Sequence, residues 1–332
     1  MKVGVFEIEE WEKEHFTKPL GQDNIIFSSD PLTLDTISQA QDCDILSVFI
    51  YTQLTKELLE KLPHLKCIVT RSTGFDHIDT SYCKEKGIIV SNVPYYGAHS
   101  VAEHTFSLLL AISRMLIPSV ERTKKGSFDL TGLTGFDLFG KTLGILGFGS
   151  IGKNVCKIAQ GFGMNVLCFT TNFTPEDAET YKVKFVQLPE LLTSSDIISL
   201  HLPLTSETKH IFQKETFAQM KKGTILLNTA RGGLIETESL VEALENGTVK
   251  AAGLDVLEEE CMIREERQLL SRHFLQECDL QTQLLNHMLL TKENVVITPH
   301  NAFNSQESLH TILTTTIENI QAYMNQKPIN TV

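Results

Sequence analysis

Short apolar runs and amphipathic stretches alternate along the first hundred residues. β-Branched and aromatic residues fill the runs "KVGVFEI", "DILSVFI", "CIVTR" and "IIVSNV", and the helical pattern "TKELLEKLPHL" lies between the second and third of them. Strands that are separated by segments of helix length predict parallel βαβ units. We therefore expect a small α/β domain at the start of the chain.

The next segment, "AHSVAEHTFSLLLAISRMLIPSVERTKKG", is apolar on several helical faces. Such a pattern predicts one long helix that is buried between two bodies rather than lying on the surface of one. From Thr142 onward, strands and helices alternate regularly up to the strand "NVVITPH". This alternation predicts a doubly wound domain over residues 99–301.

Two segments near the C-terminus depart from that alternation. Residues 259–292 are charged and amphipathic, so we expect one part to be helical and the rest to lie on the surface. The last segment has apolar residues at helical spacing behind Ser305, a plausible N-cap, and should return the chain to the first domain. The predicted fold class is α/β, with a flavodoxin-like domain (1–98 plus 302–332), a Rossmann-type domain (99–301) and a cleft between them.

Charge and cysteine content narrow the possible partners and the compartment. Forty-one acidic and 29 basic residues give a net charge of −12, which disfavours binding to nucleic acid. The seven cysteines are odd in number and form no C-x-x-C pair, so free thiols in a reducing cytoplasm are expected. We find no signal-peptide pattern and no run of roughly 18 apolar residues, and therefore expect no membrane partner.

The strongest motif is "GILGFGSIG", which contains G-x-G-x-x-G as Gly147, Gly149 and Gly152. It follows a predicted strand directly and opens a predicted helix, which is the context that dinucleotide binding requires. Gly147 permits the tight turn, Gly149 lets the backbone approach the pyrophosphate, and Gly152 allows close packing of the helix on the strand. The free N–H groups at the helix N-terminus favour the phosphates.

The end of the second strand of this domain bears on the choice of cofactor. A carboxylate is expected there, about 20 residues after the glycines, to accept the ribose hydroxyls of NAD. Instead the chain has Thr170, Thr171 and Asn172, which do not repel a 2′-phosphate. No arginine completes a strong phosphate clamp and three acidic residues follow closely, so NAD(H) and NADP(H) both stay open, with NADP(H) slightly favoured.

Three ionisable residues each follow a predicted strand, where doubly wound folds place their ligands. Arg231 follows "TILLNTA", Glu260 follows "AAGLDVLEE", and His300 closes "NVVITPH". Each has an ordinary structural interpretation by itself, as a surface ion pair, a solvated acid or a turn residue. Their joint occurrence behind a dinucleotide loop favours a catalytic site.

The chain resembles the D-isomer-specific 2-hydroxyacid dehydrogenase family over nearly its whole length. The matching stretches are "RSTGFDHID", "NVPYYGAHSVAEHT", "LGILGFGSIG", "HLPLT", "LLNTARGGLI", "GLDVLEEE" and "ITPHNAF". The tyrosine in "VPYY", the aromatic in "PHNAF" and the long insertion before "ITPH" are more similar to the D-lactate dehydrogenase branch than to the phosphoglycerate or formate branches. Glu260 is also unlike the formate branch, which uses a glutamine as the partner of its histidine.

The resemblance implies a reaction and a role for each matching residue. Arg231 clamps the carboxylate of a 2-keto acid, with a planar fork that lysine cannot reproduce. His300 protonates the carbonyl oxygen as hydride arrives at the carbon, and Glu260 orients its imidazole and favours the protonated form. Asp255 receives the nicotinamide carboxamide and so fixes the stereochemistry.

The resemblance also implies contacts to substrate and cofactor. The implied substrate-binding residues are Ser72, Thr73 and Gly74, whose backbone N–H groups hold the carboxylate from the first domain, together with the pocket aromatics Tyr96 and Phe303. The predicted cofactor contacts are Gly147, Phe148, Gly149, Ser150, Ile151, Gly152, Thr170, Thr171, Asn172, His201, Pro203, Thr229, Ala230 and Asp255. Cys261 stands where many members have proline, which bears on how rigidly Glu260 is held. No metal is predicted.

Several alternatives stay open at this point. The substrate is pyruvate or a similar 2-keto acid, and the main alternative is NADPH-dependent reduction of glyoxylate or hydroxypyruvate. A less favoured alternative is a corepressor-like protein that binds dinucleotide without turnover. A homodimer through the nucleotide-binding domains is expected from the resemblance, because "AHSVAEHTFSLLLAISRML" is too apolar to face water.

Overall fold

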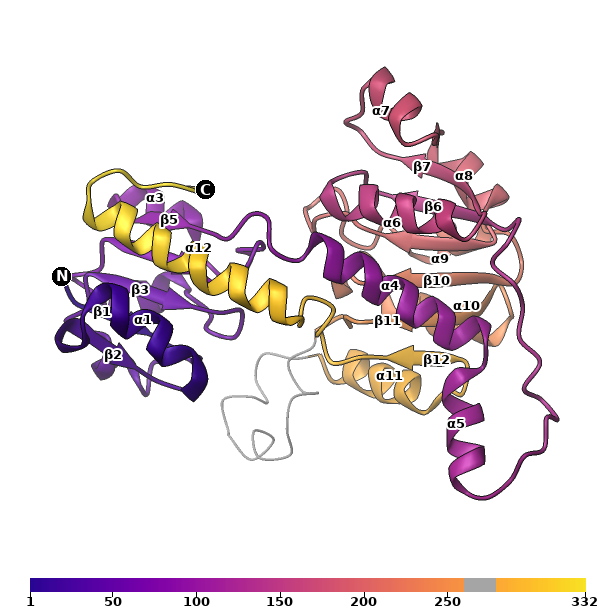
Figure 1. The fold of residues 1–332 in the computed structure, drawn as a ribbon, viewed down its shortest axis with the longest axis horizontal. Helices are drawn as coiled ribbons and strands as arrows, with labels where there is room; N and C mark the ends of the chain where they lie inside the picture. The colour runs from indigo at the N-terminus through magenta and orange to yellow at the C-terminus, as the bar shows by residue number, and fades with distance from the viewer. Residues whose placement is uncertain (260–278) are drawn as a thin grey trace. The chain divides into compact units, whose positions relative to one another are not determined.

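The computed structural model describes residues 1–259 and 279–332 and divides into two compact units (Figure 1). The first unit comprises Met1–Tyr96 and Asn304–Val332, and the second comprises Gly97–Phe303. Each unit is built on its own parallel sheet with helices packed against it. The prediction of two α/β domains with parallel sheets is therefore confirmed.

The sheet of the first unit has the order β2-β1-β3-β4-β5 and all of its pairings are parallel. This is the flavodoxin-like order, in which the carboxyl ends of the strands carry the ligand-binding loops. Its elements are β1 (Val3–Val5), α1 (Lys13–Leu20), β2 (Ile25–Phe27), β3 (Ile45–Val48), α2 (Lys56–Leu59), β4 (Cys67–Thr70), α3 (Thr80–Lys86), β5 (Ile89–Ser91) and α12 (Gln306–Met324), with short 3-10 turns at Glu10–Glu12, Gln22–Asn24 and Ile37–Gln39.

The C-terminal helix α12 completes the core of the first unit. Leu313 and Ile320 of this helix are buried against strand residues such as Val5 and Val69. The expected cap is present, because the Ser308 N–H donates to Ser305 Oγ at 3.2 Å. The edge strand β2 was not predicted from the sequence, since three half-buried residues make a weak pattern.

The sheet of the second unit has the order β12-β11-β10-β9-β6-β7-β8, again with parallel pairings. The strand order reverses between β6 and β9, and doubly wound sheets bind ligands at the carboxyl ends beside such a reversal. Its elements are α4 (Ala98–Ser113), α5 (Leu116–Lys124), β6 (Thr142–Leu146), α6 (Ser150–Gly161), β7 (Asn165–Phe169), α7 (Pro175–Thr180), β8 (Lys184–Phe185), α8 (Leu188–Ser194), β9 (Ile197–Leu200), α9 (Lys214–Ala218), β10 (Thr224–Asn228), a 3-10 turn at Gly232–Leu234, α10 (Thr237–Glu245), β11 (Val249–Leu254), α11 (Leu280–Thr291) and β12 (Val295–Ile297).

The prediction of a single long helix after residue 97 is wrong, because the chain bends at Met115 and forms two helices. Met115 has a φ of 51°, which ends α4 and starts α5 in a new direction, 63° away. The carbonyl of Ser113 leaves the helix and accepts instead from the Phe136 N–H at 2.9 Å. Among the described residues, no single helix is long and apolar enough to cross a membrane.

Candidate active site

The glycine loop after β6 has the geometry that a dinucleotide phosphate needs. Gly147 has a φ of 96°, and a Cβ there would collide with the carbonyl of His201. A Cβ at Gly152 would collide with the Gly147 carbonyl, whereas Gly149 faces open space. The loop is thus closed on the protein side and open on the side from which the backbone can approach a pyrophosphate.

The other residues of this loop divide into two groups. Ser150 and Ile151 begin α6, so their backbone N–H groups belong to the free N-terminus of that helix. Phe148 is buried and packs edge-on against Tyr181 and Phe185. Phe148 therefore fixes the loop on the core of the unit, and only its backbone is available to a cofactor.

His201 follows β9 and lies directly beside the glycine loop. Its ring Nε2 lies 2.8 Å from Ser199 Oγ, and its buried Nδ1 has no hydrogen-bond partner among the described residues. Burial lowers the pKa of His201 to about 3, so the imidazole is neutral. Buried polar atoms usually have a hydrogen-bond partner, so the unpaired Nδ1 of His201 beside the glycine loop is consistent with a partner group on a bound cofactor.

The end of β7 is followed by Thr170, Thr171 and Asn172, none of which carries a carboxylate. Thr170 is half-buried and its hydroxyl lies within 3.4 Å of the Asn172 N–H. The nearby carboxylate of Asp177 accepts from the Thr174 N–H at 3.0 Å and pairs with Lys153 at 2.7 Å. The hydrogen bond from Lys153 holds the pKa of Asp177 below its ordinary value. The Asp177 carboxylate thus interacts with the N-terminus of α7 and with Lys153.

Arg231 lies in a tight turn after β10. Its Nη1 donates to the Ala230 carbonyl at 2.8 Å, and Asn228 Nδ2 donates to the Arg231 carbonyl at 2.9 Å. Thr229 is buried and shares a 2.9 Å hydrogen bond with Thr105 of α4. These contacts hold the backbone of the turn, while the guanidinium stays half-buried at the carboxyl end of the sheet.

Asp255 holds the loop that carries His300. Its carboxylate accepts from Thr298 Oγ1 at 2.5 Å and from the N–H groups of Ala302 at 2.8 Å and Asn301 at 3.0 Å. Burial raises the pKa of Asp255, but hydrogen bonds from His104, Thr298 and the backbone outweigh it and leave the pKa below its ordinary value. The role expected for Asp255 at the carboxamide stays a prediction.

His104 is a member of this network that sequence reasoning passed over. Its Nε2 lies 2.9 Å from Thr298 Oγ1 and 3.4 Å from Asp255 Oδ1. His300 itself has a φ of 52°, and its N–H donates to the Thr298 carbonyl at 2.9 Å. The Asp255 network thus fixes the backbone on both sides of the imidazole. Glu260 and Cys261 lie outside the described residues.

In the first unit, the loop after β4 is held by its own side chains. Ser72 is buried and its hydroxyl donates to the Gly74 carbonyl at 2.6 Å. Thr73 donates to the Val93 carbonyl at 2.8 Å, and Asn92 Nδ2 donates to the Thr73 carbonyl at 2.7 Å. These bonds turn the hydroxyls of the loop toward the protein, which leaves the backbone as its ligand-binding element.

A buried charge network lies behind that loop. The Arg71 guanidinium, 3% exposed, donates to the carbonyls of Phe6 at 2.8 Å and Glu7 at 2.5 Å. The Glu7 carboxylate accepts from the N–H groups of Phe49 at 2.7 Å, Tyr51 at 2.7 Å and Thr52 at 3.1 Å. Burial lowers the pKa of Arg71, and the charges of Glu12 and Glu7 oppose that change. The loops after β1, β3 and β4 are therefore tied together.

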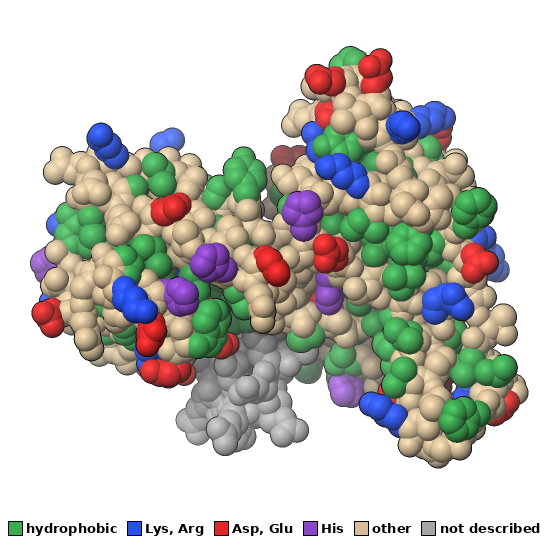
Figure 2. Space-filling model, in the orientation of Figure 1, with side chains coloured by type: hydrophobic (Ala, Val, Ile, Leu, Met, Phe, Trp, Pro, Cys, Tyr) green, Lys and Arg blue, Asp and Glu red, His purple; other side chains and the backbone are tan. Residues whose placement is uncertain are grey.

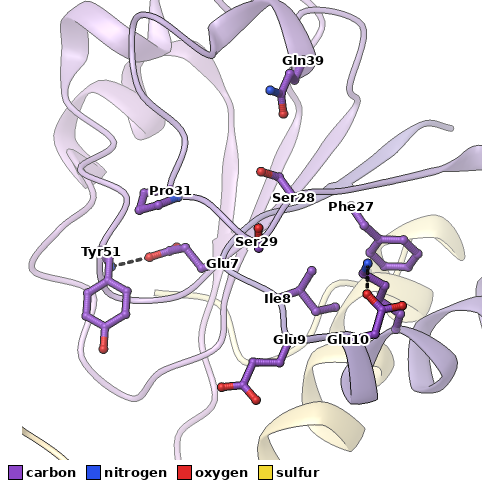
Figure 3. Close-up of a pocket in the computed structure, with 11 residues that line it drawn as sticks. Glu7, Ile8, Glu9, Glu10, Phe27, Ser28, Ser29, Pro31, Gln39 and Tyr51 are labelled. Carbon is purple, nitrogen blue, oxygen red and sulfur yellow. Dashed lines mark hydrogen bonds and ion pairs between the residues drawn. The ribbon is translucent and has the colours of Figure 1, made fainter. Parts of the chain in front are cut away.

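Figure 3 shows this region, with the Glu7 carboxylate pointing toward Tyr51 beside an open hollow of about 840 Å³. The hollow lies at the carboxyl ends of β1, β2 and β3, and it is lined by residues that include Ser28, Ser29 and Gln39. It shares the sheet edge that carries the Ser72–Gly74 loop. No motif pointed to Glu7 or Tyr51, and Arg71, although it opens the matching stretch "RSTGFDHID", was assigned no role from the sequence.

The remaining predicted residues are placed as follows. Tyr96 is half-buried in the first unit, and its carbonyl accepts from Ser308 Oγ at 3.1 Å. Phe303 is half-buried in the second unit, where it backs on Gly97. Pro203 is exposed and its carbonyl accepts from Thr208 Oγ1 at 2.6 Å. In the described part of the chain, no three His, Cys, Asp or Glu side chains are grouped to hold a metal ion.

Comparison with known proteins identifies the family. Residues 106–302 match the model of the D-isomer specific 2-hydroxyacid dehydrogenase NAD binding domain. D-lactate dehydrogenase of Escherichia coli is 34% identical over 96% of this chain and 96% of its own length. Hydroxypyruvate reductase of Thermotoga maritima is 37% identical over 90% of each chain.

Solved structures agree with these matches. D-lactate dehydrogenase of Aquifex aeolicus, complexed with NAD and lactic acid, has a TM-score of 0.88 and 34% identity over 98% of this chain and 96% of its own. An acyclic imino acid reductase in complex with NADPH and D-Arg has a TM-score of 0.82 and 29% identity over the full length of both chains. The chain therefore belongs to the D-isomer-specific 2-hydroxyacid dehydrogenase family, in its D-lactate dehydrogenase branch, and is a nicotinamide-dependent oxidoreductase.

Proposed function

We propose that this protein reduces a small 2-keto acid, pyruvate or a similar compound, to the D-2-hydroxy acid. The observation that carries the proposal is the set of residues at the carboxyl edge of the second sheet. Arg231 follows β10, the Asp255 network follows β11, and His300 follows β12, all in the unit that contains the glycine loop. When bound, the reduced nicotinamide supplies the hydride.

Arg231 binds the substrate carboxylate in this proposal. Its guanidinium offers two parallel donors that match a carboxylate and orient the carbonyl group beside it. The turn that carries Arg231 is held by Asn228 and packs directly against the next loop, which supports the proposal because the backbone of Arg231 is fixed before the substrate binds. Such preorganisation reduces the entropy that is lost when the substrate binds.

His300 donates a proton to the carbonyl oxygen during reduction and takes it back during oxidation. The Asp255 network supports this role because it fixes the backbone around an imidazole that itself stays half-buried. Glu260 is proposed as the partner that keeps the imidazole protonated, and this assignment rests on its sequence position. The Ser72–Gly74 backbone, in the other unit, is proposed as a second carboxylate contact.

We propose NADP(H) as the slightly preferred cofactor, with NAD(H) as the alternative. The strand end carries Thr170 in place of a carboxylate, and Asp177, one of the three acidic residues that follow, pairs with Lys153, so a 2′-phosphate meets no carboxylate at the strand end itself. The residues that hold either cofactor are proposed to be the glycine loop, the Thr170–Asn172 segment and His201.

The test is steady-state oxidation of NADH and of NADPH, each with saturating pyruvate, glyoxylate and hydroxypyruvate in turn. Turnover of pyruvate supports the proposal. Preference for hydroxypyruvate supports the main alternative, which is also suggested by the 37% identity to the hydroxypyruvate reductase of Thermotoga maritima. Cofactor binding without turnover of any 2-keto acid would leave the corepressor-like role and overturn the proposed reaction.

We also propose a homodimer formed through the second unit, but for a reason that differs from the sequence argument. The apolar residues of α4 are largely covered within their own unit. Exposed apolar side chains are found instead on α11 and on α5 and the chain after it, and in that last segment Phe128, Leu130 and Phe139 are each about 80% exposed. Figure 2 shows hydrophobic side chains gathered over α5.

Sedimentation velocity tests the dimer. Replacement of Phe128 and Leu130 by serine should shift a dimer toward monomer, because apolar patches of this kind are buried at protein interfaces. Replacement of the exposed Tyr95 of the first unit is the matched control and should leave the sedimentation coefficient unchanged. A wild-type monomer would contradict the proposal. A cytoplasmic location is proposed on the sequence evidence alone.

A further inference from the structure

A His–Glu pair joins the loops on either side of the Arg231 turn. His210 lies after β9 and Glu258 lies after β11, and these two strands flank β10, which leads into Arg231. His210 Nε2 contacts Glu258 Oε1, and the two side chains are only 29% and 14% exposed. The pair therefore connects the two loops on either side of β10, the strand that leads into Arg231, the proposed carboxylate-binding residue.

The second oxygen of Glu258 caps the helix that follows the turn. Glu258 Oε2 accepts from the Thr237 N–H at 3.0 Å and from Thr237 Oγ1 at 2.8 Å. Thr237 is the first residue of α10, whose own N-cap residue, Glu236, makes no side-chain cap bond. A carboxylate at this place satisfies a free N–H and stabilises the positive end of the helix.

The backbone of the turn is clamped from both sides. The His210 N–H donates to the Gly233 carbonyl at 2.8 Å, which ties the turn to the loop after β9. On the other side, a Cβ at Gly232 would collide with the Leu257 carbonyl, so the turn lies directly on the chain that leads into Glu258. The turn from Arg231 to Thr237 is therefore held at Gly232 and Gly233, in its middle, and at Thr237, at its end.

The anchor of this arrangement is itself buried. Asn286, 1% exposed on α11, donates from Nδ2 to the Glu258 carbonyl at 2.7 Å. A carboxylate that accepts hydrogen bonds from both an imidazole and a helix N-terminus has few alternative positions. The contacts thus connect α11, the loop after β11 and the Arg231 turn in one network.

We propose that His210 and Glu258 are positioning residues that hold Arg231 where it binds the carboxylate of the 2-keto acid. This inference rests on the proposed function of Arg231. A guanidinium fork recognises a carboxylate only in a narrow geometry, and a displacement of about 1 Å at such a group can lower the rate on the order of 10²-fold. The pair touches neither the glycine loop nor the end of β7, so its effect is confined to the substrate.

The test compares E258Q and H210Q with the wild type. Glutamine at 258 keeps the volume and one acceptor but loses the charge, and glutamine at 210 removes the imidazole. The expected result is a rise of about tenfold or more in KM for pyruvate, with the dissociation constant of the reduced cofactor unchanged. Binding of oxamate, a carboxylate analogue of pyruvate, to the enzyme–cofactor complex should weaken in parallel, which makes the result independent of turnover.

A matched control separates positioning from stability. The Asp196–Lys221 pair of the same unit has an N–O distance of 2.6 Å, and Asp196 also accepts from the Thr142 N–H at 2.9 Å. This pair lies at the amino ends of β6 and β9, the opposite edge of the sheet. D196N should lower Tm but leave KM for pyruvate unchanged. If E258Q behaves in the same way as D196N, the inference is overturned.

Two further outcomes identify which claim fails. If Glu258 acts through Arg231, the effect of E258Q on oxamate binding should disappear in the R231Q background. If R231Q binds oxamate normally, both the proposed clamp and this inference fail. If R231Q loses binding while E258Q keeps it, only the inference fails. A changed pH profile of kcat/KM in E258Q would assign the pair a direct proton role and would also overturn it.

Discussion

The two units hold their functional loops at the same edge of a parallel sheet by different means. In the second unit, loops approach one another so closely that only glycine fits, as at Gly147, Gly152 and Gly232. In the first unit, the charged side chains of Glu7 and Arg71 hydrogen-bond to the backbone of neighbouring loops, a device that the second unit uses in addition to its glycines, at Asp255. Glycine leaves room for two loops to pack backbone against backbone, whereas Glu7 and Arg71 supply side-chain hydrogen bonds to backbone groups that have no backbone partner.

This difference explains why one site could be predicted from sequence more fully than the other. A glycine requirement leaves a local signature with fixed spacing, such as G-x-G-x-x-G. The partners of Arg71 lie 64 and 65 residues away, and no local pattern marks them. Side-chain grips between distant loops therefore become visible only in the folded chain.

The largest effect on turnover is expected from substitution of His300. This substitution tests whether the catalytic acid lies in the second unit. H300Q should lower kcat by about 10²–10⁴-fold, because it removes the general acid while the Asp255 network still holds the loop. Cofactor affinity and Tm should be unchanged. H310Q, on the exposed face of α12 in the first unit, is the control and should retain wild-type turnover. Equal kcat in the two variants would contradict the assignment.

Glu7 tests the grip of the first unit. E7Q should lower the free energy of unfolding by about 2 kcal/mol, because charged hydrogen bonds to the N–H groups of Phe49 and Tyr51 are lost. Affinity for the cofactor, which belongs to the other unit, should not change. E10Q is the matched control, since the side chain of Glu10 is 89% exposed and its loss should have no measurable effect on urea denaturation. A stable E7Q protein would show that backbone packing alone holds these loops.

Thr170 tests the cofactor preference of the second unit. T170D should shift the ratio of kcat/KM values by about tenfold or more toward NADH, because a carboxylate repels the 2′-phosphate and accepts the ribose hydroxyls of NADH. T171N, one residue further along and neutral, should leave the ratio close to that of the wild type. An unchanged ratio in T170D would place the determinant elsewhere.

A further effect, similar in size to that of E7Q, is a pH dependence that belongs to the second unit. The folded pKa of His201 is about 3, below its ordinary value of 6.5. Between these values the unfolded chain binds a proton at His201 and the folded chain does not, so the free energy of unfolding should fall as the pH is lowered, by about 1.4 kcal/mol per pH unit. Hydrogen exchange at pH 7 and pH 5 should show this loss in the second unit, and H201Q should reduce it. Equal losses in H201Q and the wild type would exclude His201 as the cause.

Local periodicity and motif spacing were enough to predict most strands, both sheets and the dinucleotide loop. They failed at Met115, where a carbonyl exchanged its helical partner for a bond to a distant loop, and at β2, which is too short to carry a pattern. The same limit applies to His210 and Glu258. The triplet of acids in "EEE" looks solvated, yet the side chain of Glu258 is 14% exposed and joins three segments.

The sequence by itself determined the α/β class, the glycine loop and the order of the ionisable residues behind successive strands. These features depend on neighbours in the chain, whose spacing is preserved whatever the rest of the molecule does. Only the tertiary structure decided that Asp255 holds the His300 loop, that Asp177 pairs with Lys153, and that Glu258 caps α10. Each of these contacts depends on which distant groups arrive within hydrogen-bond reach once the strands have paired.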